Sequence, residues 1–202
     1  MLKEVADSLP YTSGSLYHAA VHALDQGIAI SPTSGFHHAK YHSGGAFCTF
    51  NGLTIAAQLL RSRQKVKRVG IVDFDCHYGN GTVDIIEHLG LKHIVHLTYG
   101  EQFHRFSGAE AWLGTLTREL QPFAQCGILI YQAGADPHRD DPLGGDLTTE
   151  QMLERDRIVF RFAKDRGIPI VWNLAGGYQQ PFGNVLDLHE NTLKVCLEVF
   201  RP

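Results

Sequence analysis

Residues 67–75, KRVGIVDFD, form a short apolar run that begins after two basic residues and closes on two aspartates. A run of this length between polar residues is typical of a strand that is covered on both faces of a sheet. Segments with helical periodicity flank it, TFNGLTIAAQLLRSR (49–63) before it and GTVDIIEHLG (81–90) after it. A buried strand between two helices predicts a parallel sheet that is covered by helices.

The same alternation of helix and strand continues in both directions along the chain. We expect further strands at 27–32, 93–100, 127–135 and 168–177, and further helices at 13–26, 109–123, 148–167 and 184–200. The predicted fold class is therefore α/β, with three α/β/α layers around a mainly parallel sheet. A chain of 202 residues with 44% hydrophobic content can bury one substantial core, so we expect a single domain over residues 1–202.

The composition argues against several classes of partner. A formal net charge of −3 gives no general attraction to nucleic acid or to an anionic membrane. No apolar run is long enough to span a bilayer, and residues 1–14 lack the apolar segment of a signal peptide. No CxxC pair occurs among the cysteines, which are Cys48, Cys76, Cys126 and Cys196. We therefore expect reduced thiols in a cytoplasmic protein that binds neither nucleic acid nor membranes.

Unusual polar residues follow four of the predicted strands. In chain order they are His37 and His38, then Asp73, Asp75 and His77, then Asp136, and finally Tyr178. Ligands of open α/β sheets bind at the carboxyl ends of the strands, because loops and helix N-termini converge there. We therefore expect these side chains to share one site.

Three of these residues have the spacing of metal ligands. Asp73, Asp75 and His77 are two positions apart, so their side chains project to one side if the strand continues through them. A carboxylate and an imidazole from this run, joined by Asp136, make an oxygen and nitrogen set for a divalent ion with a position left open for water. Such sets are typical of catalytic zinc sites. We expect Cys76 to face the other side of the strand and to pack rather than to bind metal.

Each motif alone also has an ordinary structural explanation. A single DxDxH run is often strand-end hydrogen bonding, and adjacent histidines are more often surface or core residues than catalytic groups. The segments GADPHRDDPLGG (134–145) and AGGY (175–178) have the composition of turns. Their occurrence together, in one order along one predicted sheet edge, is what favours a functional site.

In four motifs the chain resembles the histone deacetylase and acetylpolyamine amidohydrolase superfamily. Members of this superfamily have the arginase-like fold. The four motifs are GFHHAKYHSGGAFCTFN (35–51), VDFDCHYGNGT (72–82), GADPHRDDPLGG (134–145) and LAGGY (174–178). Members of that superfamily are usually much longer, and the region ahead of the tandem histidines is short here. The resemblance identifies a shortened member.

The resemblance implies a zinc-dependent amide hydrolase that removes an acetyl or other acyl group from an amine. It makes Asp75, His77 and Asp136 the ligands of one zinc ion per chain. His37 and His38 correspond to the tandem histidines that activate water and protonate the leaving amine. The two roles are not assigned between them by the sequence.

Further residues take roles from the same resemblance. Tyr178 corresponds to the tyrosine that binds the developing oxyanion, whereas Asp73 and Asn80 correspond to the partners that orient the two histidines. Phe47, Leu143 and Gly176 correspond to residues that contact the substrate. A structural monovalent cation is a further expectation.

The substrate and two alternative functions remain open. Acetylated lysine, an acetylated polyamine and a small acetylated metabolite all fit the motifs. One alternative is a catalytically inactive remnant that binds acyl-lysine, and another is a binuclear manganese ureohydrolase of the same fold. The ureohydrolase needs more bridging aspartates than one DxDxH run and Asp136 supply. Because the chain is short, pairing of two copies into a homo-oligomer is a further hypothesis.

Overall fold

The structure, a computed structural model, describes residues 3–102 and 108–201. Within these residues lies a sheet of five parallel strands in the order β1-β5-β4-β2-β3. The strands are β1 (Ile28–Ser31), β2 (Val69–Asp73), β3 (Ile94–Thr98), β4 (Ile128–Gly134) and β5 (Ile170–Ala175). The predicted parallel sheet is confirmed.

The central strand β4 shows why both faces of the sheet are covered. All of its residues are buried, and successive side chains of a strand point to opposite faces. Ile128 and Ile130 belong to one hydrophobic cluster, whereas Leu129, Tyr131 and Ala133 belong to the other. A strand with this pattern is stable only between two layers of helices.

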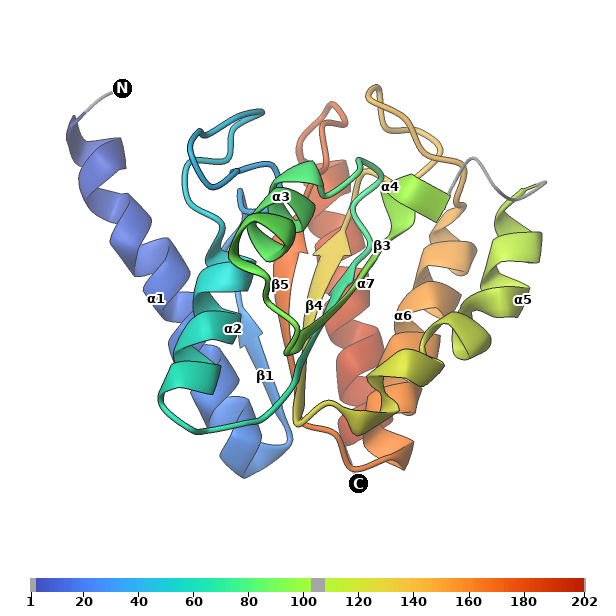
Figure 1. Cartoon of the computed structure of the whole chain (residues 1–202). Helices are drawn as coiled ribbons and strands as arrows, with labels where there is room; N and C mark the ends of the chain where they lie inside the picture. The colour runs from blue at the N-terminus through green and yellow to red at the C-terminus, as the bar shows by residue number, and fades with distance from the viewer. Residues whose placement is uncertain (1–2, 103–107, 202) are drawn as a thin grey trace.

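Helices form those two layers (Figure 1). One face packs against α1 (Lys3–Gln26), α2 (Gly52–Ser62) and α3 (Asn80–Leu89). The other face packs against α4 (Tyr99–Gln102), α5 (Ala109–Glu119), the 3-10 helix η2 (Gln121–Gln125), α6 (Thr149–Asp165) and α7 (Gly183–Phe200). The predicted three-layer α/β/α class is therefore confirmed.

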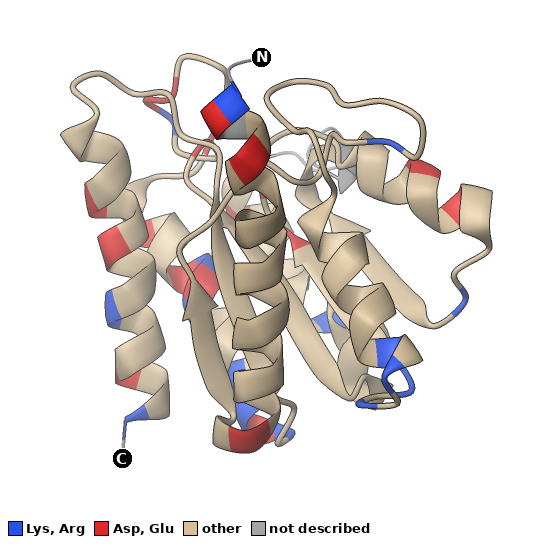
Figure 2. Ribbon diagram, turned by 90° about the vertical axis from the view of Figure 1, so that its left-hand side faces the viewer, with Lys and Arg blue, Asp and Glu red and all other residues tan. Residues whose placement is uncertain are grey.

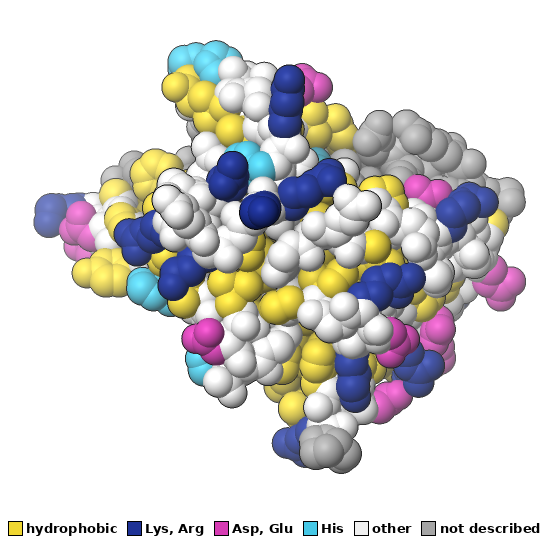
Figure 3. All heavy atoms as spheres, turned by 60° about the horizontal axis from the view of Figure 1, so that its bottom comes forward, with side chains coloured by type: hydrophobic (Ala, Val, Ile, Leu, Met, Phe, Trp, Pro, Cys, Tyr) yellow, Lys and Arg dark blue, Asp and Glu magenta, His cyan; other side chains and the backbone are white. Residues whose placement is uncertain are grey.

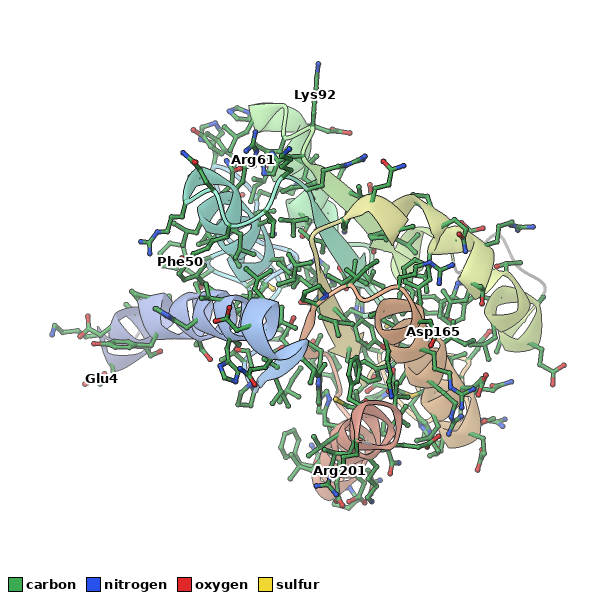
Figure 4. The ribbon with its side chains drawn as sticks, turned by 90° about the horizontal axis from the view of Figure 1, so that it is seen from below. Glu4, Phe50, Arg61, Lys92, Asp165 and Arg201 are labelled. Carbon is green, nitrogen blue, oxygen red and sulfur yellow. The ribbon has the colours of Figure 1, made fainter. Side chains whose placement is uncertain are left out.

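Basic side chains gather at the end of the molecule where the strands begin. The turn between α2 and β2 and the last turn of α2 carry an exposed set, Arg61, Arg63, Lys65, Lys67 and Arg68. Figure 2 shows blue segments at this lower end, and Figure 3 shows lysine and arginine side chains across that face. Arg61 and Lys92 lie on the same side of the molecule in Figure 4. The chain therefore has a local basic surface although its net charge is negative.

The helix predicted at 13–26 begins earlier, at Lys3. Its first turns lean away from the rest of the protein, with Glu4 near the far end (Figures 1 and 4). The side chain of Tyr11 is 79% exposed. Because this part of α1 has little buried surface, it lacks the apolar periodicity that would predict a helix. None of the helices in the described parts of the chain is long and apolar enough to cross a membrane.

Two of the other boundary differences arise where a new element begins earlier than the sequence predicts. The helix predicted at 109–123 ends at Glu119, and a 3-10 turn containing Pro122 follows it. Proline lacks the amide hydrogen needed inside a helix but suits the first turn of a new one. The strand predicted at 93–100 ends at Thr98, where α4 begins.

Candidate active site

The loops that follow β1, β2, β4 and β5 meet at the carboxyl edge of the sheet. A cavity of about 80 Å³ lies between them. Of the residues that the sequence singles out, seven line it: His37, His38, Phe47, Asp75, His77, Gly176 and Tyr178. Leu143 does not line this cavity, and its side chain is 51% exposed. The remaining three, Asp73, Asn80 and Asp136, contact residues of the cavity from behind.

The loop after β2 is bent, because the strand ends at Asp73. The strand predicted at 67–75 therefore ends two residues early, and the condition that it continues through His77 is not met. The Asp75 amide donates to Asp73 Oδ1 at 3.3 Å, and the His77 amide donates to Asp75 Oδ1 at 2.9 Å. Aspartates that accept from the amide two residues ahead stabilise turns in place of strand pairing.

This bend brings the three predicted metal ligands together. His77 Nδ1 lies 2.9 Å from Asp75 Oδ1 and 2.9 Å from Asp136 Oδ2. Both carboxylates are buried, whereas the His77 side chain is 34% exposed. Asp136 follows β4, and its Oδ1 accepts from the Cys76 amide at 3.1 Å, which ties the two loops to each other. The ligand atoms thus share one small volume, and the His77 side chain is the part of it that solvent reaches.

The charges of this group fit a divalent cation. Burial, followed by repulsion from Asp136, raises the pKa of Asp75 to about 7. Contacts with Asp136 and Asp75 raise the pKa of His77. His77 Nδ1 faces both carboxylates, and its hydrogen bond goes to Asp75 Oδ1. The buried Asp136 Oδ2, an ion-pair neighbour of the same nitrogen at 2.9 Å, receives no well-directed hydrogen bond from the described residues. Two crowded carboxylates, one unsatisfied oxygen and an imidazole are a donor set that zinc accepts.

Cys76 departs from its predicted orientation. Its Sγ lies in the same group of atoms as the ligands of Asp75, His77 and Asp136, which are all within 4.8 Å of one another. The expectation that it faces away is wrong, since strand alternation stops at Asp73. Burial raises the pKa of its thiol to about 12, and the side chain packs against the hydrophobic core. Because thiols bind metal as thiolates, these surroundings favour packing over metal binding.

The tandem histidines have different partners. His37 Nδ1 is 2.8 Å from Asp73 Oδ2, and His38 Nδ1 is 2.8 Å from Asn80 Oδ1. Burial opposes a charge on His37, but the nearby Asp73 carboxylate outweighs it and raises the pKa to about 9. Burial lowers the pKa of His38, which has only a neutral amide as partner. The pKa values of the two imidazoles, whose ring centroids are 4.0 Å apart, are therefore shifted in opposite directions.

The loop after β5 closes the cavity. The Tyr178 amide donates to Asp141 Oδ2 at 2.7 Å, and the Leu143 amide donates to Asp141 Oδ1 at 3.0 Å. Asp141 thereby links this loop to the one that follows β4. The Tyr178 ring is half-buried, and burial raises the pKa of its hydroxyl. Phe47, 88% exposed, lies at the rim with its ring centroid 6.4 Å from that of Tyr178.

Four supporting residues were not found from the sequence. Gln132 Nε2 donates to Asp73 Oδ1 at 2.9 Å, and Asn173 Nδ2 lies 3.4 Å from Gln132 Oε1. Both are polar residues at buried positions of β4 and β5, a signal that the sequence does contain. Asp141 bonds to the Tyr178 amide, and His189 hydrogen-bonds to the backbone of Gly176. Neither residue is a polar position in a predicted buried strand, so the sequence does not single them out.

Comparison with known proteins finds histone deacetylases among the relatives of this chain. The family model of the histone deacetylase domain matches residues 1–108 and 94–193. Histone deacetylase 2 of Arabidopsis thaliana is 30% identical over 211 residues, which cover 94% of this chain and 54% of that protein. Histone deacetylase 6 of Caenorhabditis elegans is 47% identical over 192 residues, which cover 79% of this chain and 19% of that protein. The chain thus spans about half the length of the Arabidopsis relative.

A solved structure shows the same fold. The acetylpolyamine aminohydrolase from Burkholderia pseudomallei superposes with a TM-score of 0.72 at 23% identity, over 93% of this chain and 62% of that one. At this level of identity the superposition supports the fold alone. The family model, by contrast, covers nearly the whole sequence in two overlapping segments. On that basis the chain belongs to the histone deacetylase domain family.

Proposed function

We propose that this chain is a single-domain, zinc-dependent deacetylase that hydrolyses the amide of an N-acetylated amine. One observation supports it above all. The ligand atoms of Asp75, His77 and Asp136 converge beside His37, His38 and Tyr178 at one cavity. Acetylated lysine, an acetylated polyamine and a small acetylated metabolite are the proposed substrates. The small volume of the cavity favours a short acyl group.

Asp75, His77 and Asp136 would hold the ion, one per chain. Zinc bound there would supply Lewis acidity to the acyl carbonyl and to a water molecule. Two observations support this position: two carboxylates crowd around His77 Nδ1, and Asp136 Oδ2 receives no well-directed hydrogen bond from the described residues. Gln132 would assist indirectly, because it fixes Asp73 behind the tandem histidines.

The two histidines would divide the proton transfers. His38, whose partner Asn80 is neutral, would accept the proton of the attacking water. His37, charged beside Asp73, would hold a proton for the leaving amine nitrogen. A positioned acid or base of this kind typically contributes about 10²–10⁴ in rate. Tyr178 would donate its hydroxyl hydrogen to the oxyanion from the opposite side of the cavity.

An assay of the zinc-loaded chain tests this proposal. A fluorogenic acetyl-lysine peptide and an N-acetylated polyamine would be offered, and bound metal would be counted by elemental analysis. We expect one zinc per chain and turnover of at least one substrate. The Asp136→Asn variant should lose both. Zinc that stays bound in this variant would refute the ligand assignment, and a loaded chain without turnover would favour the acyl-lysine-binding remnant.

The metal count also separates the ureohydrolase alternative. Among the described residues, one group of three or more His, Cys, Asp or Glu side chains has its ligand atoms close enough to share an ion, and it contains Asp75, His77 and Asp136. Two manganese ions per chain would contradict the deacetylase proposal. A homo-oligomer, a structural monovalent cation and a cytoplasmic location stay predictions. Light scattering tests the first, and a monomer would rule it out.

A further inference from the structure

Arg155 and Asp156 are neighbours in α6, and both are buried. Arg155 Nε donates to Asp156 Oδ1 at 2.8 Å, and Nη2 lies at the same distance from that oxygen. Removing two charges from water is costly, and apolar replacements of such pairs are often neutral or even stabilising. A contribution to folding stability is therefore a weak explanation for the presence of this buried ion pair. Its contacts point to another role.

The guanidinium joins the two chain segments that carry the metal ligands. Arg155 Nη1 donates to the carbonyl of Gly134 at 2.8 Å and to that of Phe74 at 3.3 Å. Phe74 directly precedes Asp75, and Gly134 lies two residues before Asp136. One nitrogen thus bridges both segments at the point where each turns into the site.

The position of this bridge along the strands is informative. The pairing of β2 with β4 ends at Asp73 and Gln132, and one further backbone hydrogen bond follows, from the Phe74 amide to the Gln132 carbonyl. The two segments stay in close contact beyond it, since a Cβ on Gly134 would lie 2.6 Å from Asp75 Cα. Arg155 connects them where the strand pairing stops.

Asp156 holds the guanidinium in place from the other side. The Tyr131 hydroxyl of β4 donates to Asp156 Oδ1, and the Thr192 hydroxyl of α7 donates to Oδ2 at 2.7 Å. The carboxylate is thereby fixed by two elements besides its own helix. Because guanidinium is planar and rigid, fixing one edge also fixes the edge that faces the carbonyls.

We propose that Arg155 is a positioning residue that sets the spacing between Asp75 and Asp136, with Asp156 as its anchor. This inference rests on the metal site proposed above. Groups that orient metal ligands typically change metal affinity or activity by about 10–100-fold when they are lost. The expected defect is therefore in ion affinity and coordination geometry, and not in folding alone.

The test uses Co²⁺ as a spectroscopic probe in place of zinc, with the whole chain. The double variant Arg155→Met, Asp156→Asn removes both charges. The asparagine oxygen can still accept from the Tyr131 hydroxyl, and its amide nitrogen can donate to the Thr192 hydroxyl. We expect its Co²⁺ dissociation constant to rise by about 10–100-fold, with a changed visible absorption spectrum. Arg157→Met is the matched control. Arg157 is on the same helix, but it pairs with Glu154 and Glu198 at the surface and should leave both readouts unchanged.

Arg155→Lys provides a second variant should the double variant fail to fold. Lysine keeps the charge and can reach a carbonyl, but it lacks the planar fork, so we expect intermediate Co²⁺ affinity. A dissociation constant within about twofold of the parent and an unchanged spectrum, in whichever variant folds, would overturn the positioning role. The parent chain failing to bind Co²⁺ or Zn²⁺ would instead refute the proposed metal site, and this inference with it.

Discussion

Gly176 shows how closely backbone and carboxylate are packed at the site. Its φ is +53°, and a Cβ added there would lie 2.3 Å from Asp136 Cγ. Both features require glycine, because the left-handed region disfavours other residues and the buried Asp136 carboxylate is held by the Cys76 amide. The family resemblance implies that Gly176 contacts the substrate. Its packing against Asp136 adds a structural requirement.

Gly176→Ala should therefore weaken metal binding and destabilise the fold. The left-handed conformation alone costs alanine about 1–2 kcal/mol, and the clash would displace Asp136. Zinc content and urea unfolding would measure the two effects. Gly183→Ala is the control, since nothing lies within 4 Å of a Cβ at that position. Equal zinc content in Gly176→Ala and the parent would contradict this account.

Tyr178→Phe separates chemistry from metal binding. Losing one donor to an oxyanion commonly costs about 10²–10³ in kcat. We expect a fall of that size in kcat, with zinc content and unfolding free energy unchanged, because the Tyr178 amide still bonds to Asp141. Steady-state kinetics would measure it. Tyr11→Phe, at an exposed position of α1, is the matched control. A kcat equal to that of the parent would remove Tyr178 from the mechanism.

At the scale of elements, α7 is joined to the loop after β5 through His189. Burial, followed by repulsion from Arg155, lowers the pKa of His189 to about 4, from 6.5 for an ordinary imidazole. Between these values the unfolded chain binds a proton at this position, whereas the folded protein does not. Stability therefore rises with pH across this window, and it is lost as the pH falls.

His189→Gln should reduce that loss. From about pH 7 to about pH 5, we expect the unfolding free energy of the parent to fall by roughly 1–2 kcal/mol more than that of the variant. Urea unfolding of the metal-free proteins at both pH values would measure the difference. His18→Gln, at an exposed position of α1, controls for loss of an imidazole. Parallel pH profiles for parent and His189→Gln would show that His189 is not the group concerned.

The arrangement of elements was largely predictable, because apolar runs and helical periodicity report burial directly. The buried strand β4 and the helix α6 are examples. Local hydrogen bonding was less predictable. The turn after Asp73 and the inward position of Cys76 depend on side chains bonding to nearby amides, which a period of two residues does not reveal.

The candidate site divides in the same way. Residues with distinctive chemistry at strand ends, such as His37 and Asp136, were found because the carboxyl edge of a parallel sheet collects them. Supporting residues were missed where their role depends on a distant partner. Arg155 belongs to a helix with ordinary surface arginines, and only the fold shows that it reaches the carbonyls of Phe74 and Gly134.

For the whole molecule, the proposed ion should raise the stability of the fold. Zinc at about 100 times its dissociation constant adds about 2.7 kcal/mol, if the unfolded chain does not bind it. For 202 residues this corresponds to a Tm increase of roughly 5–10 °C. Thermal unfolding with zinc and with EDTA would measure it. We expect Cys76→Ala to keep the increase and Asp75→Ala to lose it, and the reverse pattern would make the thiol a ligand.

Because β1 lies at the edge of the sheet beside β5, it can join the sheet only after β5 has been synthesised. Its neighbour in the sheet is β5, with Ile28 opposite Ile170. At the usual pace of translation, on the order of ten seconds separate the synthesis of these two strands. During that interval the nascent chain has α1 and β1 without the strand that joins β1 to the sheet. The cavity, too, can assemble only after β5 and the glycine-rich loop behind it have been translated.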